Sequence, residues 1–374
     1  MIIYFTDFYS MWISFKIIFI NIYLVEEMRK NKNKNTNIIN NSNTQKNITN
    51  KKKEEEILIL KQDYILSSNN VKRDDITKYY KISSKILGNG TTGFVYIGEN
   101  EKGKFAIKRI NKDKLTDIES IKQEVKYSKL NHENIIKYYE IFEDLKTISF
   151  VMELCDGDLF DFVLNTPEQK LSIDLCIEIT IQILKVIKFL HYEKNIIHRD
   201  LKPENFMINI GENNYPIVKL IDFGFAENIP KDKLLFEIVG TLDYSAPEVI
   251  SNFGYNEKMD IWSIGIIIFN MLTGLEPFKS DNTSTLIDEI KFKKINFNLI
   301  EDEKMRNLVM KMLERNCRKR INANEAYDII MNIKKERDLE YEKEINDQII
   351  KMEKIKQQKM DYENYMNPYI NNVY

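Results

Sequence analysis

Three short stretches of the sequence hold residues that could act on a phosphate group. They are GNGTTG at residues 88–93, HRDLKPEN at 198–205 and DFG at 222–224. Glycines let a backbone approach phosphate oxygens because no Cβ atom stands in the way. Phosphoryl transfer needs positioning and charge neutralisation more than covalent help. The second and third stretches contain the acidic, basic and amide side chains that such positioning requires.

The glycine pattern, Gly88, Gly90 and Gly93, is weak evidence when taken alone, because a similar pattern opens a helix in dinucleotide-binding domains. Here the alternating residues 94–97 and 105–107 predict strands after the glycines, and Lys108 lies on the third strand. This context favours a loop that folds over phosphates. An ordinary glycine-containing hairpin is the alternative.

The elements that must position these residues can be outlined from the pattern of apolar side chains. Residues 116–136 predict a helix capped by Thr116 and ended near Asn131. Residues 148–163 predict a strand that runs into a turn and a helix. Residues 171–194 are apolar nearly all round, which is typical of a buried helix.

Taken in order, these motifs resemble those of a eukaryotic protein kinase. The residues that carry the resemblance are Gly88-x-Gly90-x-x-Gly93-x-Val95, Ala106-Ile107-Lys108, residues 198–205, Asp222-Phe223-Gly224 and Ala246-Pro247-Glu248. The resemblance covers residues 79–333. It implies a bilobal α+β fold, with a small antiparallel β-sheet lobe carrying one main helix (79–153) and a large, mainly helical lobe (154–333).

The resemblance implies ATP and Mg²⁺ as cofactors and a role for each polar group. Lys108 would bind the α- and β-phosphates and would be oriented by Glu124. Asp200 would accept or orient the proton of the substrate hydroxyl, and Lys202 would steady the γ-phosphate. Asn205 and Asp222 would hold Mg²⁺, a hard cation that prefers oxygen ligands.

The resemblance also implies a nucleotide site. Val95, Ala106 and Met207 would enclose the adenine, the backbone of Met152 to Cys155 would read its edge, and Asp158 would bond the ribose or a basic substrate residue. The expected nucleotide-binding set is Gly88, Asn89, Gly90, Gly93, Val95, Ala106, Lys108, Met152, Glu153, Cys155, Asp158, Glu204 and Met207. For Met207 and Cys155, plain core packing is an equal alternative.

Within the protein kinases, the sequence is most similar to the calmodulin-dependent and calcium-dependent serine/threonine group. Lys202 and Thr241 are typical of kinases that act on protein serine and threonine, and Glu204 suggests basic residues near the phosphoacceptor. No calcium-binding loop of the form DxDxDG…E follows the kinase segment, so direct calcium binding is not expected. Asp260 is expected to anchor the loop at 198–205, and Glu248 to pair with Arg320.

Two departures from the family pattern keep a second class of function open. The stretch from Glu124 to His132 is one residue short, which places Ser128 where an apolar residue is expected and makes Glu124 the least secure assignment. The stretch after Met152 is also one residue short. The alternative is a kinase-like scaffold that binds nucleotide but transfers phosphate weakly or not at all.

The segment between Gly224 and Thr241 has sixteen residues and no serine, threonine or tyrosine. In related kinases the arginine before the catalytic aspartate, here Arg199, pairs with a phosphate on this segment. The equivalent position here is Glu237. A carboxylate carries less charge than a phosphate, but it is permanent, so Glu237 is expected to replace the activating phosphate.

Composition limits the remaining possibilities. With 55 Lys and Arg against 57 Asp and Glu, the net charge of −2 gives no reason to expect a nucleic-acid partner. Three unpaired cysteines fit a reducing compartment. Together these favour a cytoplasmic protein.

The two ends of the chain differ from its middle. Residues 8–25 are apolar and just long enough to span a membrane, but Lys16 opposes insertion by about 2.5–3.5 kcal/mol. Residues 1–27 are therefore a possible membrane anchor or a mis-assigned start before Met28. Residues 28–78 are expected to be a low-complexity basic linker. Residues 334–374 are expected to form a charged helical tail, either solvated or used for docking or autoinhibition.

Overall fold

The computed structural model describes residues 64–68, 70–89, 93–211, 215–231 and 233–370, with side chains as far as Asp361 except that of Asn89. The apolar run 8–25 and Gly90 lie outside these residues. The described chain forms one compact unit that begins at Tyr64. In it, no helix is both long enough and apolar enough to cross a membrane.

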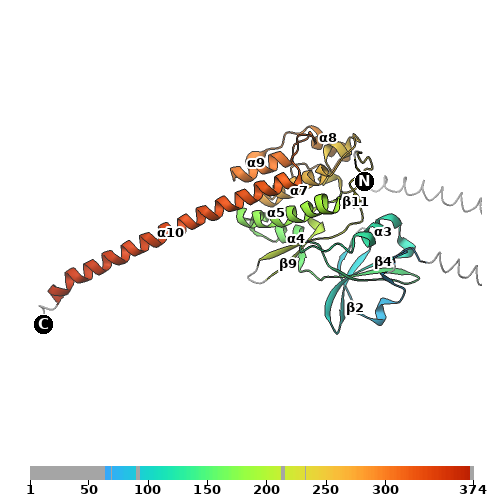
Figure 1. The fold of residues 1–374 in the computed structure, drawn as a ribbon, viewed down its shortest axis with the longest axis horizontal. Helices are drawn as coiled ribbons and strands as arrows, with labels where there is room; N and C mark the ends of the chain where they lie inside the picture. The colour runs from blue at the N-terminus through green and yellow to red at the C-terminus, as the bar shows by residue number, and fades with distance from the viewer. Residues whose placement is uncertain (1–63, 69, 90–92, 212–214, 232, 371–374) are drawn as a thin grey trace, which may run out of the picture. The chain divides into compact units, whose positions relative to one another are not determined.

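The first part of this unit is a six-stranded sheet with one main helix, α3 (Ile118–Tyr127) (Figure 1). The strand order is β1-β5-β6-β4-β3-β2, and every pairing is antiparallel except that of β1 with β5. The strands are β1 (Val71–Lys72), β2 (Lys81–Asn89), β3 (Phe94–Asn100), β4 (Gly103–Asn111), β5 (Tyr138–Glu143) and β6 (Thr147–Met152). The expected sheet-rich small lobe is confirmed.

Residues 64–78 differ from the expected linker because they pack against the sheet. Val71 of β1 pairs with Ile141, and both Leu66 and Ile76 are buried. The buried carboxylate of Glu143 accepts the backbone N–H of Ile65 at 2.6 Å, and it also pairs with Arg73 and Lys112. The apolar residues here are too widely spaced to reveal this packing from the sequence, since partners such as Ile141 for Val71 and Phe142 for Ile76 are distant along the chain.

Helix α3 begins one residue later than expected. The Asp117 carboxylate, rather than Thr116, caps it by accepting the Ser120 N–H at 3.0 Å. An aspartate at this position also suits the positive end of the helix dipole. The cap fixes the start of the helix that carries Glu124.

The second part of the unit is mainly helical, which confirms the expected large lobe. Its helices are α4 (Leu159–Leu164), α5 (Ile173–Lys188), α6 (Pro247–Ile250), α7 (Lys258–Thr273), α8 (Thr283–Phe292), α9 (Glu303–Met312) and α10 (Ala323–Ile370). Short strands form two small sheets, β7 (Gly157–Asp158), β9 (Phe206–Ile210) and β10 (Pro216–Leu220) in one, and β8 (Ile196–Ile197) and β11 (Glu227–Asn228) in the other. A π-helical turn, Phe189–Lys194, follows α5.

Helix α7 lies at the centre of this lobe and is buried along almost its whole length. Its Trp262 stacks on Phe278, with ring centroids 5.9 Å apart. The fully buried guanidinium of Arg320 lies over Trp262 and donates to both oxygens of Glu248, at 2.6 and 2.9 Å. This is the expected interior ion pair, and its bidentate geometry is the one that makes such pairs strong.

Helix α10 packs on the large lobe only with its first half. Arg337 and Tyr341 bond the carboxylate of Asp174 at 2.8 and 2.7 Å, and Lys334 pairs with Glu178 at 2.8 Å. From residue 342 to residue 361 every side chain is exposed. In Figure 1 this part of α10 runs beyond α5, α7 and α9.

Candidate active site

The centre of the candidate site begins with an ion pair between the sheet and α3. Lys108 Nζ, on β4, lies 2.8 Å from Glu124 Oε2, and both residues are buried. The hydroxyl of Tyr138 donates to the other Glu124 oxygen at 3.2 Å. Burial alone would lower the pKa of Lys108, but the negative charges of Glu124 and Asp222 outweigh it and raise the pKa. The lysine therefore stays charged.

The loop that carries Asp200 is held in place by Asp260 of α7. The fully buried Asp260 carboxylate accepts the backbone N–H groups of His198 and Arg199 at 2.9 and 3.0 Å. Its Oδ2 also lies 2.8 Å from Nε2 of His191. Burial opposes ionisation of Asp260, but the hydrogen bond and charge of His191 hold its pKa below the usual value. An ionised Asp260 can accept all of these bonds, as expected for the anchor of this loop.

Both oxygens of the Asp200 carboxylate have partners. Asn205 Nδ2 donates to Asp200 O at 2.7 Å and to Oδ2 at 3.2 Å. Thr241 donates its N–H and its hydroxyl to Oδ1 at 2.9 and 2.8 Å. Lys202 Nζ lies 3.2 Å from the Thr241 hydroxyl and 3.5 Å from Asp200 Oδ2. These contacts hold the carboxylate in one orientation.

The negative charge of Asp222 also interacts with the positive charge of Lys108. Its backbone has a positive φ of 61°, and its Oδ1 accepts the Gly224 N–H at 3.2 Å. Burial would raise the pKa of Asp222, but the positive charge of Lys108 and the Gly224 hydrogen bond hold it below the usual value. Asp222 is therefore ionised at neutral pH.

Arg199 connects this centre to the segment between Gly224 and Thr241. Its Nη1 lies 3.0 Å from Glu237 Oε2, and its Nε donates to Phe225 O at 2.6 Å. Tyr255 completes the cluster, because its hydroxyl accepts from Arg199 at 3.2 Å and donates to Glu237 O at 2.6 Å. The Arg199 side chain is 6% exposed, whereas that of Glu237 is 68% exposed.

Comparison with known proteins decides the family. The protein kinase domain family matches residues 80–329. The chain belongs to the protein kinase family. Calcium-dependent protein kinase 5 of Plasmodium berghei is 38% identical over 234 residues, which are 62% of this chain and 40% of that protein.

Two further relatives match the chain with similar identity and coverage. Calcium-dependent protein kinase 4 of Plasmodium falciparum is 35% identical over 255 residues, 65% of this chain and 48% of the relative. CDPK-related kinase 3 of Arabidopsis thaliana is 36% identical over 257 residues, 65% of this chain and 42% of the relative. The chain thus spans less than half the length of these curated relatives.

The oxygens near Asp200 fit a magnesium ion that is held partly by nucleotide phosphates. Asn205 directs its amide nitrogen to Asp200, which leaves its oxygen as the atom available to a cation. The ionised Asp222 provides a carboxylate oxygen. No cluster of three or more His, Cys, Asp or Glu side chains suited to a metal occurs among the described residues. Mg²⁺ is commonly bound by one or two such groups together with substrate phosphates.

The apolar residues expected around the adenine lie together. Ala106 and Met152 belong to one buried cluster, and Val95, Cys155 and Ile221 pack against it. Ile221, which immediately precedes Asp222, was not expected from the sequence. Burial raises the pKa of the Cys155 thiol to about 12, so this thiol stays neutral. Met207 lies on β9 beside Asp158 of β7.

The segment after β6 has backbone groups without a hydrogen-bond partner among the described residues. In the described part of the chain, the C=O of Glu153 and the N–H of Cys155 make no hydrogen bond, so both are free to read an adenine edge. The Glu153 side chain is directed elsewhere, because it bonds Asn209 and pairs with Lys219 at 3.1 and 3.3 Å. Only the backbone of Glu153 can therefore serve the nucleotide.

The remaining expected residues fall into three groups. Asp158 caps α4 by accepting the Asp161 N–H at 2.8 Å, a contact that competes with the expected ribose bond. Glu204 is exposed on the turn before β9. Gly93 has a packing role, since a Cβ atom there would lie 2.3 Å from Arg109 O, whereas at Gly88 it would meet nothing within 4 Å.

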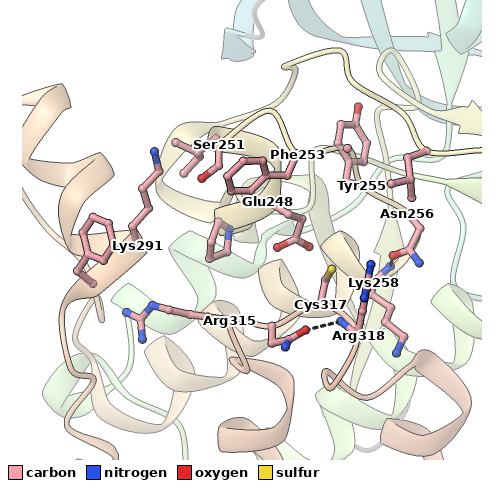
Figure 2. Close-up of a pocket in the computed structure, with 16 residues that line it drawn as sticks. Glu248, Ser251, Phe253, Tyr255, Asn256, Lys258, Lys291, Arg315, Cys317 and Arg318 are labelled. Carbon is pink, nitrogen blue, oxygen red and sulfur yellow. Dashed lines mark hydrogen bonds between the residues drawn. The ribbon is translucent and has the colours of Figure 1, made fainter.

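A separate pocket of about 920 Å³ lies in the large lobe, and none of the expected catalytic, nucleotide-binding or magnesium-binding residues lines it (Figure 2). Phe253 and Tyr255 line one side of it, and Arg315, Cys317 and Arg318 line another. Glu248, paired with the buried Arg320, is also part of its lining.

The unusual Ser128 does not weaken the core of the site, because Tyr127 fills the apolar position. Tyr127 is 4% exposed, and its ring centroid lies 6.2 Å from that of Phe223, next to Asp222. Ser128 is half-buried and bonds Val125 O through its hydroxyl at 2.8 Å. The stretch after Glu124 is one residue short, and it is accommodated because Tyr127 rather than Ser128 takes the apolar position. The Lys108–Glu124 pair still forms.

We therefore expect Tyr127→Ala and Ser128→Ala to have very different effects. Removing the buried Tyr127 ring leaves a cavity beside Phe223 and should lower the free energy of unfolding by about 3–5 kcal/mol. Ser128→Ala removes one hydroxyl at a half-buried position and should cost less than about 1.5 kcal/mol. Urea unfolding of the two variants provides the measurement. Equal losses of stability would contradict the assignment of Tyr127 to the apolar position.

Proposed function

We propose that this chain is an ATP- and Mg²⁺-dependent protein kinase that transfers the γ-phosphate to serine and threonine hydroxyls. The observation that carries the proposal is the fixed Asp200 carboxylate, held by Asn205 and Thr241 while the Lys108–Glu124 pair is formed. The activity of the whole protein is a proposal, because the matched segment covers less than half of each of these curated relatives.

In this proposal each polar group of the site has one task. Lys108, kept charged by Glu124, binds the α- and β-phosphates, and Mg²⁺ supplies neutralisation of the charge that develops on the phosphoryl oxygens. Asp200 accepts or orients the proton of the attacking hydroxyl. Because Thr241 and Asn205 hold its two oxygens, the carboxylate is preorganised and need not be reoriented during the reaction.

The proposed substrate class rests on the resemblance to serine/threonine kinases, of which Lys202 and Thr241 are typical. Lys202 lies near both Asp200 and the Thr241 hydroxyl, which is compatible with that class. The exposed carboxylate of Glu204 supports recognition of a basic residue near the phosphoacceptor. Asp158 supports it less, because its carboxylate already caps α4.

The kinase-like scaffold is the alternative function, which the comparisons do not favour, and Asp200→Asn separates the two. This change keeps the shape of the side chain but removes the base, so phosphorylation of a basic peptide should fall by about 10²–10⁴-fold. ATP affinity should stay within about threefold, because Asp200 does not form the nucleotide pocket. Peptide phosphorylation and ATP binding are measured side by side. The matched control is Asp281→Asn, an exposed aspartate that should change neither. Phosphorylation that survives Asp200→Asn would favour the scaffold.

We also propose that Glu237 takes the place of an activating phosphate. Three contacts support this: the 3.0 Å pair with Arg199, the Tyr255 hydrogen bond to Glu237 O, and the bond from Arg199 to Phe225 O. Together they connect the loop of Asp200 to both ends of the segment. Because the Glu237 side chain is largely exposed, its pair with Arg199 stabilises the ordered segment by only about 0.2–1 kcal/mol.

This small energy predicts a moderate effect of Glu237→Ala. Protein made in bacteria, treated with phosphatase and assayed without calcium should phosphorylate a basic peptide, and Glu237→Ala should lower the rate severalfold, since about 1.4 kcal/mol corresponds to tenfold. The exposed Glu193→Ala serves as the control. Loss of all activity on phosphatase treatment, or a silent Glu237→Ala, would refute the role of this carboxylate. A strict need for calcium would refute the expectation that the kinase acts without binding it.

For location we propose a cytoplasmic kinase whose residues 8–25 can attach it to a membrane. The support is the near balance between ten Ile, Leu, Val and Phe side chains and Lys16. Full-length protein should then sediment with membranes and resist carbonate extraction, whereas protein that starts at Met28 should stay in the supernatant. Full-length protein found only in the supernatant would rule out the anchor.

A further inference from the structure

The pocket in Figure 2 gathers the two most exposed large apolar side chains that the structure describes. Phe253 is 78% exposed and Phe292 is 77% exposed, and both belong to its lining. Leu234, from the segment between Gly224 and Thr241, is 47% exposed and also lines it. Large apolar side chains that lie together and open to solvent mark binding sites. The three side chains therefore indicate a partner that covers them.

The walls of this pocket come from separate segments that hydrogen bonds hold together. Leu235 and Tyr255 exchange backbone hydrogen bonds at 3.0 and 2.9 Å, which joins two of the walls. The Nε of Arg315 donates to Ile290 O at 2.9 Å and so ties the loop after α9 to the end of α8. A partner would meet a site that is already formed, and little free energy would be lost in ordering it.

The charges of the lining are positive with one exception. The basic side chains are Lys258, Lys291, Arg315 and Arg318. Glu248 is the only acid among the described residues that line the pocket, and Arg320 donates to both of its oxygens. Lys291 and Arg318 form no ion pair with a described residue, and in Figure 2 they lie on opposite sides of the pocket. The site thus offers positive charge to the carboxylates of a partner.

We propose that this pocket binds an acidic peptide segment of another protein through that segment's large apolar side chains. The apolar side chains enter the hollow, whose volume of about 920 Å³ is sufficient for them. Carboxylates before and after them in the peptide interact with Lys291 and Arg318.

The exposure of the two phenylalanines favours a peptide over a small molecule. Phe253 and Phe292 are more than three-quarters exposed, so they project from the rim of the pocket. A compact ligand inside the hollow would leave both rings in water, whereas an extended segment can cover them. An anionic membrane could cover the rings and meet the positive charges, but its flat surface would leave the hollow unfilled.

Peptide binding to the full chain, measured by fluorescence anisotropy without ATP, tests the proposal independently of kinase activity. The probes are labelled synthetic peptides of about twelve residues, which span about 40 Å when extended. Each carries phenylalanine or leucine side chains between runs of aspartate and glutamate. One matched peptide has alanine in place of the apolar residues, and another has lysine in place of the acids. We expect an acidic apolar probe to bind saturably, and both matched peptides to bind at least about tenfold more weakly.

Variants of exposed residues locate the binding. Phe253→Ala and Phe292→Ala should each raise the dissociation constant at least about tenfold, and thermal unfolding should not change because both side chains are exposed. Arg318→Glu should raise it at least about fivefold at low salt and less at high salt. The matched controls are Phe160→Ala on α4 and Lys319→Glu beside Arg318, both exposed and outside the lining. Each should leave the dissociation constant within about twofold.

The outcomes that would overturn the proposal are distinct. One is that no probe binds saturably below about 1 mM. Another is that the alanine peptide binds as well as its parent, or that Lys319→Glu weakens binding as much as Arg318→Glu, since either result means charge attraction without a site. Vesicles containing phosphatidylserine that bind through Phe253 and Phe292, while the peptides do not, would assign this surface to a membrane. Self-association of the chain through the same two residues, without peptide binding, would assign it to a second copy.

Discussion

The active site depends on the buried carboxylate of Asp260. Its bonds to the backbone N–H groups of His198 and Arg199 hold Arg199 at a φ of 70°, a left-handed conformation that costs about 1–3 kcal/mol for a residue other than glycine. Helix α7 supplies Asp260 from the most buried part of the large lobe. The rigid core thus imposes a backbone shape that the loop would not adopt alone.

Two consequences follow from that imposed shape. The side chain of Arg199 is directed to the segment between Gly224 and Thr241, where it bonds Phe225 O and Glu237. The carboxylate of the next residue, Asp200, instead accepts hydrogen bonds from Thr241 and Asn205. One backbone conformation therefore links the proposed base to the ordered state of the segment. Disorder in the segment would release Thr241 from Asp200, which is a direct route from Glu237 to the chemistry.

Much of this arrangement could be predicted from the sequence, because the chemistry restricts residue type and spacing. Lys108, Asp200, Asn205 and Asp222 lie in short motifs, and the structure brings them to one place. The contact of Thr241 with Asp200 was not foreseen, since it joins residues 41 positions apart through a loop without regular structure. It was also not foreseen that Tyr127, rather than Ser128, fills the apolar position beside Phe223. Helical spacing predicts which side chains share a face, but the rotation of α3 against Phe223 is set by packing.

The packing of residues 64–78 could not be predicted because their partners are distant and their pattern is sparse. Glu143, on β5, gathers the Ile65 N–H, Arg73 and Lys112 around one buried carboxylate. Removing any single partner leaves charge or hydrogen-bonding capacity unmatched in a buried place, which is costly. The same constraint operates at Glu248 with Arg320 and at Glu124 with Lys108. In each case an acid on one element is neutralised by a base on another, so the buried charges fix which elements must meet. The Glu237–Arg199 pair differs, because only the arginine is buried. That asymmetry makes it the one pair of the four whose acid can leave for solvent at little cost.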